Sequence, residues 1–503
     1  MLSPKDKFFS ADHLKSGLKE RAVKSAGITL AAQAVKLILQ LGSIAILARL
    51  LEPSDFGLIA MVTVFTGLAL QFMEGGLSMA TIQRDQITHG QVSNLFWINA
   101  GLGAGMFILG VLAAPLVANL YEEPRLTLIM AAMSLTFLIG GLSVQHDAIL
   151  RRQMRFRAIS IIDITSIALG IVAGIVAAFI GFGYWALVIS TVTTFLSKTI
   201  LRWLSTAWLP SLMRRGTGVR PLLNFGVNLL GANFVGYFAN NITPFAVAYI
   251  GGAQSMGLYN RANTLTSIPS KQLLPPLMNV MQPTLARVAQ NPERLRTTII
   301  SLMGKIVFFT MFLTITMAAL ADWIVELFLG AGWSGVVPIF RLLALFSLVE
   351  PIAGFLSVSL IAVGNAKALL RWKMITLGIL VISVAIGAFW GALGIVSAYA
   401  LSGVFIRLPF FLYYASKFLP VSFSDFTKAL LPAVVCAAGT LLLLYTFRQF
   451  YVFENPIIGL LYTLPIAAAS YIALGLSLKS TRIEILDTIK LFKLLNLKRR
   501  GVK

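Results

Sequence analysis

The stretch AGITLAAQAVKLILQLGSIAILARL, residues 26–50, is an apolar helix interrupted by a polar stripe. Thr29, Gln33, Lys36, Gln40 and Ser43 recur at steps of three or four residues, so they share one helical face. A lysine near the middle of a membrane-spanning helix costs about 2.5 to 3.5 kcal/mol and is usually kept where it lines a cavity or meets a partner. The stretch therefore predicts a membrane protein whose first span faces a polar, positively charged cavity.

The composition of the whole chain also indicates a membrane protein. Hydrophobic residues make up 57% of the 503 residues and charged residues only 12%. Apolar runs near twenty residues in length predict an all-α, polytopic protein with about fourteen transmembrane helices. We expect these spans to begin near residues 26, 56, 93, 126, 158, 183, 223, 258, 299, 336, 374, 394, 430 and 456.

Basic residues predict the orientation. They gather in alternate segments between the spans and in the carboxyl tail, so the positive-inside rule places both termini in the cytoplasm. Residues 1–24 form a charged amphipathic segment without the apolar core of a cleavable signal peptide, and residues 479–503 form a basic tail. The net charge of +22 is explained largely by this topology. Nucleic-acid binding is disfavoured, because the cations are spread over many loops beside spans.

The chain contains an internal repeat. Leu30 to Leu58 aligns with Leu230 to Leu258 at an offset of 200 residues, and Gln33 and Gln40 fall on Asn233 and Asn240. Six predicted spans separate the copies, which predicts two parallel six-helix lobes, residues 25–210 and 211–420, around a central cationic cavity. Residues 421–478 then supply two extra helices. The proline-rich eighth span, with Pro269, Pro275, Pro276 and Pro283, predicts kinking or unwinding.

The repeat and the positions of the charges indicate candidate residues for contact with an anionic, hydroxyl-rich substrate. Lysine offers a point charge, arginine a bidentate phosphate contact, and amides both donate to and accept from hydroxyl groups. The candidates, cations first, are Lys36, Lys271, Arg261 and Arg49, followed by Gln33, Gln40, Asn233, Asn240 and Asn241. Helix–helix hydrogen bonding is the alternative for each asparagine, and anchoring at the outer membrane interface is the alternative for Arg49 and Arg261.

Four further ionisable residues lie in predicted spans. Asp163 either neutralises a basic cavity residue or couples a proton, and Arg341, Glu350 and Arg407 have the same two alternatives of charge balance and coupling. Glu350 follows Arg341 by nine residues, which places the two on opposite faces of one helix. Cys436 is the only cysteine and the three histidines are scattered, so we expect no disulfide, metal site or cofactor.

Several motifs resemble those of one transporter family. The stretch LARLLEPSDFG, residues 47–57, resembles the first outside turn of the polysaccharide and O-antigen flippases of the multidrug/oligosaccharidyl-lipid/polysaccharide superfamily. GLYNRA at 257–262 is also similar. ILRRQMRFR at 149–157 and GFGYWAL at 181–187 are most similar to the branch of colanic-acid and succinoglycan exporters. The resemblance covers roughly residues 20 to 420.

This resemblance implies a function. It implies a flippase that moves an undecaprenyl-diphosphate-linked oligosaccharide across a bacterial inner membrane by alternating access, for exopolysaccharide, capsule or O-antigen synthesis. The implied partners are the polyprenyl-diphosphate-linked glycan, the lipid bilayer, and polymerase and chain-length or export proteins of the same pathway.

Two other classes compete with a flippase. A membrane glycosyltransferase would need positioned carboxylates on a long loop, and no predicted outside loop exceeds about fifteen residues. A cation-coupled multidrug transporter, or a transporter of another lipid-linked precursor, is the nearer alternative. Drug transport would favour a carboxylate-lined cavity, whereas the predicted cavity is mainly basic.

Overall fold

The computed structural model describes residues 18–74, 77–84, 87–213, 220–451, 453–478 and 481–482. Every regular element in these ranges is a helix, which confirms the all-α prediction. The predicted amphipathic segment up to residue 17 and nearly all of the basic tail lie outside the described residues. The chain divides into two compact units, Met1–Gly257 and Leu258–Lys503.

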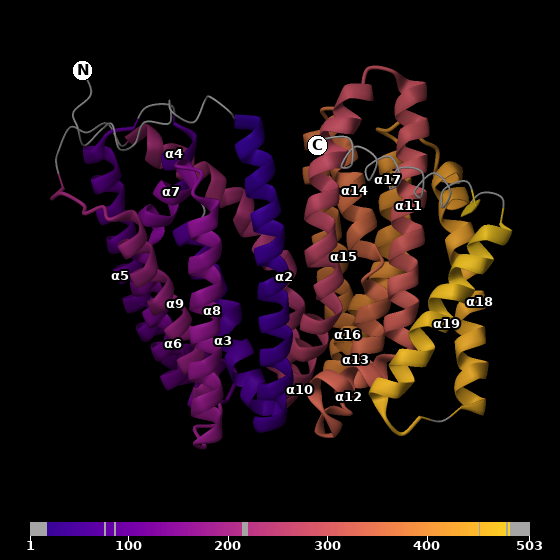
Figure 1. Cartoon of the computed structure of the whole chain (residues 1–503), viewed down its shortest axis with the longest axis horizontal. Coiled ribbons are helices and arrows are strands. Elements are labelled where there is room, and N and C mark those ends of the chain that lie inside the picture. The colour runs from indigo at the N-terminus through magenta and orange to yellow at the C-terminus, as the bar shows by residue number, and fades with distance from the viewer. Residues whose placement is uncertain are drawn as a thin grey trace, which may run out of the picture. The chain divides into compact units, whose positions relative to one another are not determined.

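Among the described residues, the N-terminal unit contains eight helices and the first part of a ninth (Figure 1, from indigo through magenta). They are α2 (Leu18–Leu50), α3 (Pro53–Glu74), α4 (Leu77–Gln83), α5 (His89–Leu120), α6 (Arg125–Gly141), α7 (Val144–Arg152), α8 (Phe156–Phe179), α9 (Trp185–Thr206) and α10 (Arg220–Val288), which continues into the second unit. Helix α2 packs along α8, and α8 packs along α9. Helix α2 thereby packs against a helix distant from it in sequence, which in turn packs against its own sequence neighbour α9.

The C-terminal unit is built from the remainder of α10 and the helices that follow it (Figure 1, from rose through orange to yellow). They are α11 (Pro292–Ala319), α12 (Ala321–Leu329), the 3-10 turn η2 (Ala331–Trp333), α13 (Val336–Phe346), α14 (Val349–Ala362), α15 (Ala366–Ala388), α16 (Gly391–Ser402), the π-helical turn η3 (Gly403–Arg407), α17 (Leu408–Ser416), α18 (Phe423–Phe450) and α19 (Pro456–Ser477). Helix α18 packs against α11 and α19, and the chain's only cysteine, Cys436, is fully buried on α18.

Local sequence signals explain where several helices begin. Thr88 and Gln91 form a capping box at the start of α5, because each side chain accepts a hydrogen bond from the other residue's backbone N–H. Ser422 and Asp425 do the same for α18. Asn455 caps α19, whose first residue is a proline, a residue favoured at that position because its missing N–H needs no partner there.

The spans agree closely with the apolar runs in the sequence. The described residues contain 11 helices long and apolar enough to cross a membrane, or up to 12 if the bent pair α6 and α7 forms one span. The two arms of α10 occupy the positions of the predicted seventh and eighth spans, but many of their side chains lie outside the described residues. The total of fourteen spans therefore stays a prediction, as do the two six-helix lobes and the separate pair at 421–478.

The first arm of α10 packs with the N-terminal unit. The hydroxyl of Tyr237 donates to the carbonyl oxygen of Val64 on α3 at 2.6 Å, and Phe245 makes an edge contact with Phe65. These contacts explain why the division between compact units falls after Gly257 rather than at the predicted lobe boundary after residue 210.

A glycine, and not the proline cluster, breaks α10. Gly252 has φ 65° and ψ −170°, and it is the one residue inside α10 with non-helical dihedrals. The backbone stays helical from residue 253 through all four prolines, so the eighth span does not unwind there, and the alternative of a kink at the prolines stays a prediction. Each proline removes one backbone hydrogen bond, whereas a glycine can take a positive φ that turns the chain without steric cost.

The two copies of the repeat meet at a close backbone contact. A Cβ atom added to Gly57 would collide with the carbonyl oxygen of Ala253, and one added to Gly257 would collide with that of Pro53. Gly57 and Gly257 differ by 200 residues, as do Pro53 and Ala253, so the contact is reciprocal under the offset of the repeat. Such reciprocity is the signature of an approximate two-fold relation between like segments.

Candidate functional site

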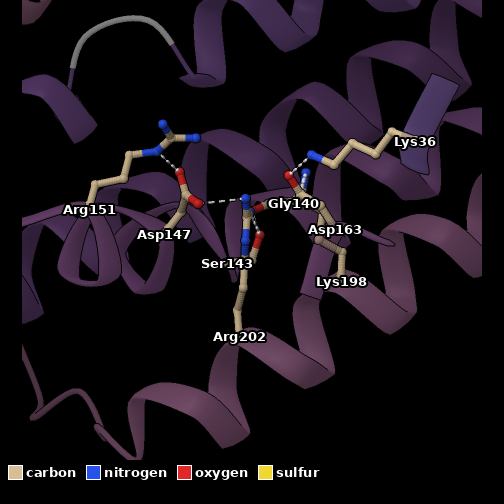
Figure 2. Close-up of polar contacts among 8 residues, drawn as sticks. All are labelled: Lys36, Gly140, Ser143, Asp147, Arg151, Asp163, Lys198 and Arg202. Atoms are coloured by element: carbon tan, nitrogen blue, oxygen red, sulfur yellow. Dashed lines mark hydrogen bonds and ion pairs between the residues drawn. The ribbon is translucent and has the colours of Figure 1, made fainter. Parts of the chain in front are cut away.

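The candidate site is a cluster of three charged side chains from three helices of the N-terminal unit. Lys36 on α2 places its Nζ 2.6 Å from Oδ2 of Asp163 on α8. Lys198 on α9 places its Nζ 3.0 Å from the other oxygen, Oδ1, of the same carboxylate. Figure 2 shows both lysines directed at Asp163 from different helices. One carboxylate is thus shared by two lysines, and the cluster keeps one excess positive charge.

Two glycines on α8 explain how Asp163 and Lys198 meet. Added Cβ atoms at Gly170 and Gly174 would press against residues 186–194 of α9, at 2.6 Å from the Ser190 carbonyl oxygen and 2.7 Å from the Ser190 Cβ. Small residues at a spacing of four let two membrane helices approach closely. Because α8 and α9 follow each other through a short turn, positions before Gly170 on α8 face positions after Thr194 on α9.

The three side chains are each only partly buried by the protein. Their exposed fractions are 23% for Lys36, 16% for Asp163 and 34% for Lys198. A fully buried ion pair would be fixed in the fold, whereas charges with this exposure can exchange partners. The cluster can therefore receive an anion without unfolding the helices around it.

A second ionic cluster lies one helical turn farther along α9 and joins it to α7. Arg202 donates to Oδ1 of Asp147 at 2.7 Å and to the hydroxyl of Ser143 at 3.1 Å. Arg151 contacts the other oxygen of Asp147, also at 2.7 Å, from one turn away on α7 (Figure 2). Arg202 is only 13% exposed. This second cluster fastens α7 to α9 and lies outside the candidate site.

The polar stripe of the first helix has mixed surroundings in the structure. Gln33 and Gln40 are exposed, while Lys36 is half-buried against α8. Arg49, at the end of α2, is exposed and donates to the carbonyl oxygen of Ala45 at 2.7 Å. These positions do not test whether Gln33, Gln40 and Arg49 contact a substrate. Their role in substrate binding stays a prediction.

The asparagines of the first arm of α10 differ in their environments. Asn240 is exposed, and Asn241 donates to the carbonyl oxygen of Tyr237 at 2.8 Å in a bond within its own helix. Asn233 has a side chain outside the described residues. A hydrogen bond within one helix satisfies an amide without involving any substrate, so Asn241 has the weakest structural support of the three.

The remaining candidates belong to the C-terminal unit. Arg261 is half-buried and donates to the side chain of Asn260 at 2.8 Å, and Lys271 is exposed. Arg341 and Glu350 are both exposed, and the helix breaks between them at residues 347–348. The two residues between α13 and α14 keep right-handed helical dihedrals, and residues 336–362 are long and apolar enough to form one span, so the placement of Arg341 and Glu350 on opposite faces stays a prediction.

Arg407 is held without a carboxylate partner in the described part of the chain. It is 7% exposed and lies in the π-helical turn η3. Its guanidinium donates to the carbonyl oxygen of Tyr399 at 2.7 Å and lies 4.8 Å from the Tyr399 ring centre and 5.2 Å from that of Phe346. Aromatic faces attract a cation through their quadrupoles. Arg407 is thus packed into the unit, and a role in coupling stays a prediction.

Sequence reasoning did not nominate Lys198. The available signal was a pair of basic residues, Lys198 and Arg202, at a spacing of four inside one apolar helix. Basic residues near the end of a span often extend to the membrane interface, so this spacing alone does not indicate a site. In the described ranges, no group of three or more His, Cys, Asp and Glu side chains gathers in a way that could hold a metal ion.

The fold is that of a known class of membrane transporters. The structure is similar to the lipid II flippase MurJ in its inward closed conformation, with a TM-score of 0.68 and 15% identity, covering 90% of this chain and 98% of that one. It is also similar to an inward-facing multidrug resistance MATE family transporter of the MOP superfamily, with a TM-score of 0.54 and 15% identity, covering 78% and 95% of the two chains. At these identities the likeness establishes the fold alone.

The sequence identifies the family within that class. The family model described as "Polysaccharide biosynthesis protein" matches residues 46–338, more than half of the chain, and the chain belongs to this family. The lipopolysaccharide biosynthesis protein WzxC of Escherichia coli K12 is 23% identical over 391 residues, 76% of this chain and 79% of that protein. The succinoglycan biosynthesis transport protein ExoT of Rhizobium meliloti is 27% identical over 358 residues, 70% and 71% of the two chains.

These relatives confirm the predicted family resemblance, including the succinoglycan branch. Together with the apolar helices, they establish a multi-pass membrane protein of polysaccharide biosynthesis. The named relatives are biosynthesis and transport proteins and carry no enzyme name.

Proposed function

We propose that this chain is a flippase for a polyprenyl-diphosphate-linked oligosaccharide in the bacterial inner membrane. It would serve exopolysaccharide, capsule or O-antigen synthesis and would work by alternating access. The family and the printed names of WzxC, ExoT and MurJ support this class of substrate. The observation that carries the proposal is the partly exposed Lys36, which lies within an apolar span and shares its one carboxylate with a second lysine.

The charge of the site suits a lipid-linked diphosphate. A diphosphate-linked glycan is anionic and strongly hydrated, so its transfer through hydrocarbon is unfavourable unless a polar path offers compensating charges. The lysine pair offers such charges, while a polyprenyl tail can stay in the surrounding lipid. We further propose that the exposed Gln33, Gln40 and Asn240 bind sugar hydroxyls, and that Arg261, Lys271 and Arg49, with Asn233 and Asn241, supply secondary contacts.

Deletion of the gene tests the function directly. If the chain is the flippase, the deletion strain accumulates complete lipid-linked glycan units on the cytoplasmic leaflet, and a plasmid copy of the wild-type gene restores surface polymer. The readout is extraction of lipid-linked intermediates, with their leaflet assigned by a membrane-impermeant oxidant. Normal intermediates together with normal surface polymer would refute the proposal.

Substitutions of Lys36 test the observation that carries the proposal. Lys36→Arg should keep part of the export, and Lys36→Ala and Lys36→Glu should fail progressively at unchanged protein level. Loss of one charge-assisted hydrogen bond costs roughly 1.5 to 3 kcal/mol, which weakens binding by more than tenfold. Surface polymer and membrane protein are measured in parallel. A well-expressed, fully active Lys36→Ala variant removes Lys36 from the site and shifts the assignment to Lys271 and Arg261.

We also propose that both termini lie in the cytoplasm. The basic segments of the sequence support this orientation, and the turns around α18 provide the test. Reporter fusions in the turn at residues 417–422 and at the carboxyl end should report cytoplasm, and a fusion in the turn at residues 451–455 should report the opposite side. An external carboxyl terminus contradicts the orientation and leaves the flippase proposal in place.

A further inference from the structure

The carboxylate of Asp163 occupies the position that an anion would take between the two lysines. Each of its oxygens faces one ammonium group, Lys36 at 2.6 Å and Lys198 at 3.0 Å, from helices on two sides. An ionised phosphate presents the same acceptor chemistry as a carboxylate, with negative oxygens that accept hydrogen bonds. Asp163 therefore resembles the ligand for which a pair of lysines is suited.

The lysine pair is suited to an anion of higher charge than the single carboxylate that it now contacts. A lysine ammonium carries three N–H donors, and Lys36 and Lys198 each form an ion pair with Asp163. Two positive charges face one negative charge, so an anion of charge minus two would neutralise the lysines more completely than Asp163 does. A diphosphate esterified at both ends carries that charge.

We propose that Lys36 and Lys198 form a clamp for the diphosphate of the transported lipid, and that Asp163 is its internal competitor, which holds the lysines when no substrate is bound. This inference rests on the proposed function and adds Lys198 and Asp163 to its site. The clamp selects a diphosphate over a monophosphate, because a single phosphate diester brings no more charge than the carboxylate that it must displace.

The neighbouring Asp147 supplies a matched control. It is as little exposed as Asp163, at 16%, and it also bridges two cations. Its cations are arginines, one of which is fixed further by Ser143 and the other of which comes from its own helix. Neutralising Asp147 therefore disturbs a helix contact of similar kind without freeing a lysine pair.

The test measures lipid binding to the purified full chain in lipid nanodiscs. The probes are a polyprenyl-diphosphate-linked sugar and a polyprenyl-monophosphate-linked sugar of equal chain length, in which the esterified diphosphate carries two negative charges and the esterified monophosphate one. Asp163→Asn should raise affinity for the diphosphate by roughly tenfold, because a charge-assisted contact that opposes binding is removed. Lys198→Met should lower that affinity by roughly tenfold and reduce the preference over the monophosphate. Asp147→Asn should leave both affinities unchanged.

A purely structural carboxylate gives different results. In that case Asp163→Asn leaves diphosphate affinity unchanged or weakens it in folded protein, and this outcome overturns the clamp. If Asp163→Asn does not yield folded protein, the Lys198→Met variant tests the clamp in its place, because it keeps the ion pair between Lys36 and Asp163. Unchanged diphosphate affinity in folded Lys198→Met protein also overturns the proposal.

The clamp and the flippase function can fail separately. If gene deletion traps lipid-linked glycan in the cytoplasmic leaflet but the purified chain shows no gain with Asp163→Asn, the clamp is wrong and the function stands. If Asp163→Asn raises affinity for the diphosphate but deletion leaves intermediates and surface polymer normal, the clamp is right and the glycan function is wrong.

Discussion

The two copies of the repeat, residues 30–58 and 230–258, share a backbone contact but differ in charge. Gly57 and Gly257 occupy equivalent positions and each approaches a carbonyl oxygen of the other copy. At the position of Lys36 the second copy has Gly236, with no atom within 4 Å of a Cβ added there. The comparison indicates that the crossing of the backbones depends on both copies, whereas the charge belongs to one copy and to the helices α8 and α9 beside it.

The largest expected effect comes from filling the backbone contact. Gly57→Ala and Gly257→Ala should each destabilise the protein by about 3 kcal/mol or more, since the new Cβ collides with backbone that cannot rotate away. Thermal unfolding in detergent and the amount of membrane protein measure the effect. We expect the two variants to behave alike, because the contact is reciprocal.

Gly101→Ala on α5 is the control for this prediction. Nothing lies within 4 Å of a Cβ added at Gly101, so alanine should be tolerated and should stabilise the helix by roughly 0.5 to 1 kcal/mol. Tolerance of alanine at Gly57 combined with failure at Gly257 would show that the two copies do not contribute equally to the crossing.

An intermediate effect is expected when the charge is moved between copies. The double variant Lys36→Ala, Gly236→Lys keeps the number of lysines and places the new one where a side chain has room. Export should still fail and diphosphate affinity should stay more than tenfold below wild type, because the charge-assisted contact of roughly 1.5 to 3 kcal/mol is made beside Lys198. Recovery of export in the double variant would contradict this expectation and would show that either copy of the repeat can supply the charge.

The smallest effect concerns the docking of the second copy on α3. Tyr237→Phe removes the hydrogen bond to the Val64 carbonyl oxygen and should lower stability by about 1 kcal/mol, with export retained. The exposed Tyr445→Phe on α18 serves as the control in the same unfolding assay. If Tyr237→Phe lowers stability by several kcal/mol, this hydrogen bond is essential for the packing of the first arm of α10 on α3.

Most of the helical architecture could be predicted from the sequence. The apolar runs predicted spans from residues 336 and 456, and α13 and α19 begin at Val336 and Pro456. Hydrocarbon thickness and the need to satisfy every backbone hydrogen bond leave little freedom in such segments. Lys36 could be identified as a candidate from the sequence because a charged residue within an apolar span is rare.

Contacts between distant helices could not be predicted. Asp163 lies 127 residues from Lys36, and no local pattern records which helix faces which. The backbone does not unwind at the proline cluster, because proline only weakens a helix, while Gly252 reverses the sign of φ.

Burial of the chain's single cysteine gives an experimental advantage. Cys436 is enclosed between α18 and its neighbours with no exposed surface, so a maleimide applied to the folded protein has no native thiol to modify. Cysteines introduced at Gln33, Gln40 or Asn240 can therefore be labelled one at a time in the otherwise natural chain. Their reactivity toward a membrane-impermeant reagent, applied first from one side and then from the other, would map the water-filled path directly in living cells.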